Sequence, residues 1–118
     1  MFNFEKLEIW QKAIEFADDL YRITKSFPAD ERFGLTNQMR RAAVSIAEGT
    51  SRSSRMAYAR FVEIATGSLF EDVSHSFIAR RQGFLSDKDF QHLYHLTEDQ
   101  SRMLSGLRTY LIGNRADH

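Results

Sequence analysis

The chain has 118 residues, in which 16 Lys and Arg balance 16 Asp and Glu, so its formal net charge at pH 7 is zero. This length suits one hydrophobic core, and we expect a single domain over residues 1–118. The balanced charge excludes attraction of the whole molecule to nucleic acid or anionic lipid, so an electrostatic partner needs a local patch.

Cysteine is absent from the chain. This excludes disulfides, thiolate metal sites and a cysteine nucleophile. Charged residues such as Glu5 and Lys6 occupy the start of the chain, where a signal peptide needs an apolar stretch, and no run of eighteen apolar residues occurs. We therefore expect a soluble cytoplasmic protein with no membrane contact.

Apolar residues recur at three- and four-residue steps from Leu7 to Lys25, which predicts a first helix. Pro28 and Gly34 then interrupt the pattern. A second helix is expected from Leu35 to Arg52, followed by a turn rich in serine at residues 51–54. Its apolar stripe contains small residues that let a neighbouring helix approach closely: Leu35, Met39, Ala42, Ala43, Ile46 and Gly49.

A third helix is predicted from Arg55 to Gln82, because Gly83 is the residue type that favours a left-handed C-cap. Ser86 with Asp89 resembles the capping box of a fourth helix, which runs to Gly113. Four long helices with short connections predict an all-α fold, an antiparallel up-down-up-down four-helix bundle.

The third helix carries apolar bulk in two directions. At 100° per residue, one face combines Phe61, Ala65, Leu69, Asp72, Ser76 and Ala79. Phe70 and Phe77 lie roughly opposite, with Thr66 and Val73 between the two faces. Because large aromatic residues are costly to expose in a row, Thr66, Phe70, Val73 and Phe77 form a candidate oligomer interface. The alternative is that the first or fourth helix half covers Phe70 and Phe77.

Four segments in this order closely resemble one family: FEKLEIWQKA, FPADERFGLTNQMRRAAVSIAEG, RFVEIATGSLFE and GFLSDKDF. They are similar to the four-helix proteins encoded within intervening sequences of bacterial 23S rRNA genes. The resemblance implies a homopentameric bundle with no established enzyme activity. The chain is also similar to the accessory variability determinant of diversity-generating retroelements, a basic pentamer that binds reverse transcriptase and nucleic acid.

The chain departs from the family pattern in one place. The pattern has about four more residues between its Ser-Ile and Ala-Glu-Gly elements, whereas Ser45-Ile46 here runs directly into Ala47-Glu48-Gly49. Four residues are close to one helical turn. We therefore expect a shorter second helix whose faces stay in phase.

Arginines concentrate between residues 40 and 60, mostly on the side of the second helix that faces away from its apolar stripe. The candidate binding residues are Arg40, Arg41, Glu48, Arg52, Arg55 and Arg60. Glu48 and Arg52 are spaced for an ion pair, so one interpretation is a solvated surface with an ordinary salt bridge.

Two other interpretations give these arginines a partner. In the first, they meet carboxylates of a neighbouring subunit, such as Glu63, Glu71 or Asp72. In the second, they bind the phosphates of RNA or DNA. The zero net charge favours subunit contact over nucleic acid, because nucleic-acid binders are usually basic overall.

Catalytic and metal motifs are weak. Asp72 with His75, and His92 with His95, are spaced i, i+3 and could in principle approach one metal ion. The chain lacks the Glu-x-x-His pairs of di-iron bundles, a nucleophile elbow and a phosphate-cradling glycine loop. Gly67 lies within the third helix, where we expect it to permit close helix packing.

We therefore expect no catalytic residue, no metal and no cofactor. The most consistent function is that of a non-enzymatic, homo-oligomeric binding or scaffold protein. The alternative is an RNA- or DNA-binding accessory protein that uses the arginines of the second and third helices.

Overall fold

The computed structural model describes residues 7–49 and 55–116. Within these ranges the chain forms four α-helices: α1 Glu8–Thr24, α2 Leu35–Gly49, α3 Arg55–Arg81 and α4 Asp87–Ala116. A short 3-10 turn, η2 Ala29–Glu31, precedes α2. The predicted all-α class is confirmed, and each helix lies close to its predicted range. The serine-rich turn at 51–54 and the end of the second helix beyond residue 49 lie outside the described residues.

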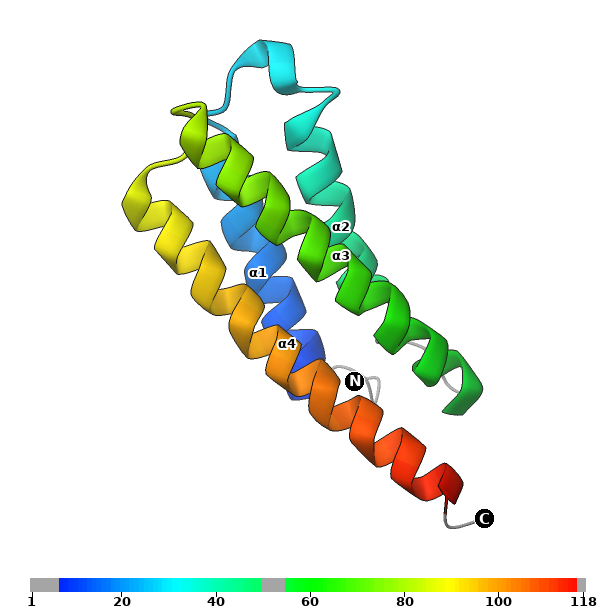
Figure 1. The fold of residues 1–118 in the computed structure, drawn as a ribbon. Helices are drawn as coiled ribbons and strands as arrows, with labels where there is room; N and C mark the ends of the chain where they lie inside the picture. The colour runs from blue at the N-terminus through cyan, green and yellow to red at the C-terminus, as the bar shows by residue number, and fades with distance from the viewer. Residues whose placement is uncertain (1–6, 50–54, 117–118) are drawn as a thin grey trace.

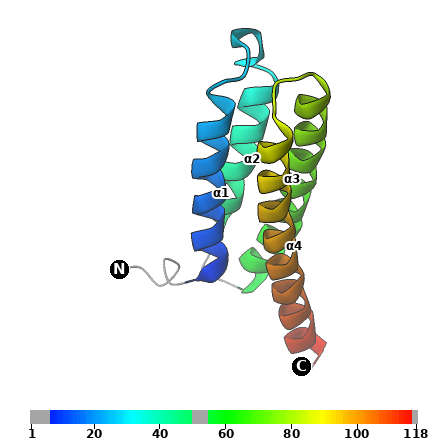
Figure 2. The same cartoon turned by 90° about the vertical axis from the view of Figure 1, so that its left-hand side faces the viewer.

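The four helices pack side by side, and each contacts two others. The contacting pairs are α1 with α2, α2 with α3, α3 with α4, and α4 with α1. Figures 1 and 2 show that neighbouring helices alternate in direction. Because α3 contacts both α2 and α4, it lies between them. No helix within residues 7–49 and 55–116 has both the length and the apolar character needed to cross a membrane.

The ends of the connection between α3 and α4 follow the predicted signals. Gly83 has a φ of 81°, and its N–H donates to the carbonyl of Arg80 at 3.0 Å. The N–H of Phe84 donates to the carbonyl of Ala79 at 2.9 Å, which completes a Schellman motif. Ser86 Oγ accepts the N–H of Asp89 at 3.1 Å, so the expected N-cap of α4 is confirmed.

The inner face predicted for the third helix is buried throughout: Phe61, Ala65, Leu69, Asp72, Ser76 and Ala79 are at most 5% exposed. The apolar residues of this face belong to one core cluster with side chains from the other three helices, among them Phe16, Met39, Ile46 and Leu93. Burial of these faces supplies the main favourable free energy of folding.

Close approach between α2 and α3 depends on Gly49. A Cβ atom placed on Gly49 would lie 1.9 Å from Phe61 Cδ1. The expected role of small residues in α2 therefore holds at this position. The expectation for Gly67 was wrong, because Gly67 is exposed and a Cβ there would meet nothing within 4 Å.

Replacement Gly49→Ala is expected to lower the free energy of unfolding by roughly 1–3 kcal/mol, because the Phe61 ring must move to admit the methyl group. Gly106→Ala is a matched control, since Gly106 lies in α4 with open space around it. That variant is expected to gain up to about 1 kcal/mol from helix propensity. Urea unfolding of both variants measures the difference, and equal effects would contradict the close contact.

Candidate functional site

The outer face of α3 carries large apolar side chains exposed to solvent: Ile64, Phe70, Phe77 and Ile78. This face lies opposite the buried inner face of the same helix. The prediction that the third helix carries apolar bulk in two directions is therefore confirmed. An exposed apolar row on a helix that is already buried on its other side is typical of a contact surface.

The candidate oligomer interface, formed by Thr66, Phe70, Val73 and Phe77, divides into a covered part and an open part. Phe77 packs edge-on against Phe90 of α4, with ring centroids 4.8 Å apart, and Arg80 lies 3.9 Å above the Phe90 ring. The alternative of partial cover by the fourth helix therefore applies to Phe77, which is 40% exposed. Phe70 is 63% exposed, so α4 leaves most of this residue open to solvent.

A groove of about 210 Å³ lies beside Phe70, between α3 and α4. Val73 belongs to its lining with Phe70, and Tyr94, Thr97 and Glu98 line it from α4. Thr66 and Val73 are half-buried, and the Thr66 hydroxyl donates to the carbonyl of Val62 at 2.7 Å. The open part of the candidate oligomer interface is therefore Phe70 together with this groove.

Arg40 points into its own subunit. Its Nε donates to Thr24 Oγ1 at 2.9 Å and its Nη2 donates to the carbonyl of Tyr21 at 3.4 Å. The guanidinium also lies 4.5 Å from the centroid of the Tyr21 ring. Arg40 therefore connects α2 to α1. Its position at the margin of the apolar stripe of the second helix did not predict this role.

The other arginines of the candidate set do not gather into one described patch. Arg41 on α2 and Arg60 on α3 are exposed, and neither forms a salt bridge within residues 7–49 and 55–116. Glu48 is exposed near the end of α2. Arg52 lies outside the described residues, and so does the side chain of Arg55. The predicted pair between Glu48 and Arg52 therefore remains a prediction.

Opposite charges line a second groove, between α2 and α3. This groove has a volume of about 490 Å³ and is lined by Gln38, Arg41, Ala42, Ser45, Ser68, Glu71 and His75. Arg41 and Glu71 thus stand on one concave surface, and Glu71 is exposed. Such a mixed surface can pair with a neighbouring subunit of the same composition.

Asp72 is unavailable to a neighbour, because its side chain is fully buried. Neither carboxyl oxygen has a hydrogen-bond partner in the structure. Burial, with a smaller contribution from the charge of Glu71, raises the pKa of Asp72 to about 9. At neutral pH this residue is therefore a protonated, neutral acid inside the bundle. The interpretation that paired Asp72 with an arginine across an interface was wrong.

His92 and His95 lie on the exposed side of α4. His92 Nε2 lies 2.8 Å from Asp19 Oδ2 of α1, and His95 Nδ1 lies 3.4 Å from Glu98 Oε1. Among the residues that the structure describes, no three His, Asp or Glu side chains form a group that could hold a metal ion. His92 and His95, which are spaced i, i+3, therefore have different carboxylate partners.

The family model described as "23S rRNA-intervening sequence protein" matches residues 5–106. The match confirms the family resemblance of the four sequence segments. No curated protein matches the chain.

Replacement Asp72→Asn is expected to remove a pH dependence of stability. The pKa of Asp72 is 3.8 before folding and about 9 after it, so folding takes up a proton between these values. The contribution of Asp72 to stability is complete below pH 3.8 and is lost as pH rises toward 9. The stability of the Asn variant relative to wild type should therefore grow with pH between pH 5 and 8, by on the order of 1 kcal/mol per pH unit.

Urea unfolding at several pH values measures this difference. Glu63→Gln, on the exposed side of α3, is the matched control and should follow the wild-type profile. Parallel profiles for wild type and Asp72→Asn would contradict the raised pKa.

Proposed function

Because the chain belongs to the family of 23S rRNA-intervening sequence proteins, we propose that it is a non-enzymatic, homo-oligomeric binding or scaffold protein. The exposed apolar side chains on the outer face of α3 carry this proposal. The pentamer that the sequence resemblance implies is the expected assembly. Burial of each large apolar side chain contributes roughly 1.5–3 kcal/mol, enough for a few of them to hold subunits together.

The distribution of these side chains around α3 favours a ring. At 100° per residue, Phe70 and Phe77 lie on the side of α4, whereas Ile64 and Ile78 lie roughly 100° away, toward α2. A cyclic assembly larger than a dimer needs two different patches on each subunit. Phe70 with the α3–α4 groove supplies one patch, and Ile64 with the α2–α3 groove supplies the other.

Charge supports the same arrangement. Arg41 and Glu71 lie in the groove beside the second patch and give it a polar margin. Interfaces commonly combine an apolar centre with a polar rim, and complementary charges fix the register of the two surfaces.

Replacement Phe70→Glu is expected to convert the assembly to monomer, because it places a charge in the apolar centre of the interface. Light scattering after size exclusion measures the mass. Phe33→Glu is the matched control: Phe33 is 86% exposed, but it lies in the connection before α2 and should leave the mass unchanged. Dissociation by the Phe33 variant alone would contradict the proposed surface.

A mixing experiment tests the two-patch arrangement. Ile64→Glu should also give monomers, because it damages the second patch. In a heterologous ring each variant retains the patch that the other has lost, so an equimolar mixture should form 1:1 dimers and nothing larger. A mixture that stays monomeric, or an Ile64→Glu variant that still assembles fully, would contradict a ring built from these two patches.

A second candidate, binding of RNA or DNA by the same assembly, is favoured by the exposure of Arg41 and Arg60. Exposed arginines can contact phosphates and release counterions. In this case Arg41→Ala with Arg60→Ala is expected to weaken binding of a short single-stranded RNA and to reduce the slope of log affinity against log salt by about 1.4.

Fluorescence anisotropy at several salt concentrations measures that slope, with light scattering on the same samples. The control is Arg22→Ala with Arg102→Ala, because these exposed arginines lie on α1 and α4 beside carboxylates of their own helix. Loss of assembly mass in the Arg41 and Arg60 variant would instead assign these arginines to subunit contact.

A further inference from the structure

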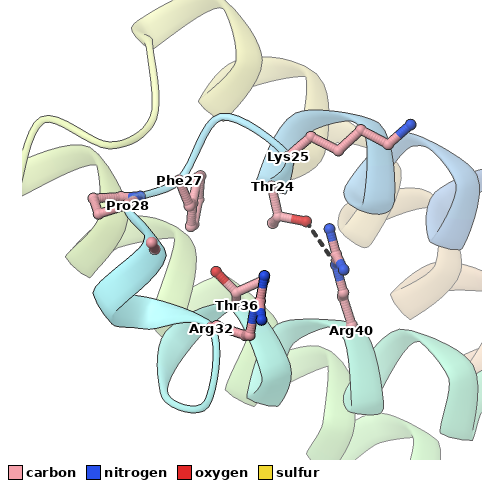
Figure 3. Close-up of a pocket in the computed structure, with 8 residues that line it drawn as sticks. Thr24, Lys25, Phe27, Pro28, Arg32, Thr36 and Arg40 are labelled. Carbon is pink, nitrogen blue, oxygen red and sulfur yellow. Dashed lines mark hydrogen bonds between the residues drawn. The ribbon is translucent and has the colours of Figure 1, made fainter.

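A pocket of about 320 Å³ lies at the end of the bundle where the chain passes from α1 to α2. Figure 3 shows that α1, the η2 turn and α2 each contribute side chains to it. Phe27 and Pro28 form an apolar part of its lining. Its polar lining comes from Thr24, Lys25, Arg32, Thr36 and Arg40. Three of these residues are cations, and none of the lining residues is acidic.

Arg40 is the central cation of this pocket. Arg40 is half-buried, and among the described residues its guanidinium contacts only neutral groups: the Thr24 hydroxyl, the Tyr21 carbonyl and the Tyr21 ring. Those hydrogen bonds use Nε and one N–H of Nη2, whereas a guanidinium has five N–H donors. A partly buried cation without a counter-charge is unfavourable. The remaining donors therefore suit an anion.

Thr36 adds a second, independent indication. Thr36 is 8% exposed as a whole residue, and it belongs to the lining of the pocket. Thr36 is the second residue of α2, so it stands at the positive end of that helix. A threonine hydroxyl can donate one hydrogen bond. A ligand in the pocket would accept it.

The remaining charges near the pocket leave it cationic. Arg32 is exposed, and it forms no ion pair among the described residues. Lys25 extends away from Thr36 and Arg40 in Figure 3, so it contributes charge from the rim. Asp30 and Glu31 lie on η2, but Glu31 Oε2 accepts the N–H of Leu35 at 3.2 Å and neither residue lines the pocket.

We propose that this pocket binds the phosphate group of a small phosphorylated ligand. Arg32 and Arg40 supply the guanidinium donors, and the Thr36 hydroxyl supplies a hydrogen bond from another direction. Guanidinium groups match the oxygens of phosphate and carboxylate. Three cations with no acidic lining residue favour the doubly charged phosphate monoester over a carboxylate. The volume falls at the lower end of the range for small-molecule pockets.

The site is separate from the surface proposed for assembly. Its residues come from α1, η2 and the start of α2, whereas the assembly surface is formed by α3 and the grooves on either side of it. Phosphate binding and oligomer mass can therefore succeed or fail independently.

Calorimetric titration of the full chain with inorganic phosphate, at constant ionic strength, tests the proposal. Saturable binding with one site per chain is expected. Thr36→Val, which keeps the shape of the side chain, and Arg32→Gln should each weaken binding by about tenfold, the loss expected for a hydrogen bond to a charged group. Arg102→Gln is the matched control, because Arg102 is exposed on α4, outside the pocket. Arg40 is left intact because it also joins α1 to α2.

Parallel titrations separate the sources of the anion. A nucleoside 5′-monophosphate that binds more tightly than inorganic phosphate would assign the rest of the pocket to the nucleoside. Equal affinities would assign a site for phosphate alone, and both results support the proposal. Acetate that binds as tightly as phosphate, equal weakening by Arg102→Gln, or binding of RNA without saturable binding of small phosphates would overturn it.

Discussion

Burial of the inner face of α3 determines what the rest of the molecule can present. That face supplies Phe61, Ala65 and Leu69 to the core, between α2 and α4. A helix that contacts neighbours on two sides has one direction left, toward solvent, and in α3 this direction carries Phe70 and Ile78. The orientation of α3 about its own axis thus buries its inner face in the core and exposes the apolar side chains on its outer face. Turning α3 to hide Phe70 would remove Leu69 or Ala65 from the core, so the two faces cannot both be buried within one subunit.

The core contains polar groups that lower its stability. Asp72 and Gln100 Oε1 on α4 are buried, and neither has a hydrogen-bond partner in the part of the chain that the structure describes. A buried carboxyl group is tolerated at neutral pH because it remains protonated, at a cost in free energy that rises with pH. An apolar residue of similar volume would avoid this cost. The four-helix arrangement therefore rests on apolar packing, and Asp72 contributes volume to that packing without an electrostatic benefit at neutral pH.

Periodicity in the sequence predicted the helices and the inner face of α3, because burial repeats every three to four residues. The Gly83 cap and the Ser86 cap were also predictable, since each depends on a local hydrogen bond. Contacts between distant residues were not. Arg40 bonds to Thr24, sixteen residues away, and its margin position on a helical projection gave no sign of this. The η2 turn and the cap that Glu31 gives to α2 were missed, because Pro28 and Gly34 indicated only a break. Exposed Gly67 shows that glycine alone does not indicate close packing.

The arginine-rich segment combines residues with different physical roles. Arg40 and Arg41 are adjacent in sequence and therefore lie roughly 100° apart around α2. This rotation places Arg40 against Tyr21 and Thr24 of α1, and it places Arg41 in the groove shared with α3. A local excess of positive charge in the sequence thus becomes two separated sites, one between α1 and α2 and one between α2 and α3. Arg40 acts through short-range contacts, which salt screens less than long-range attraction.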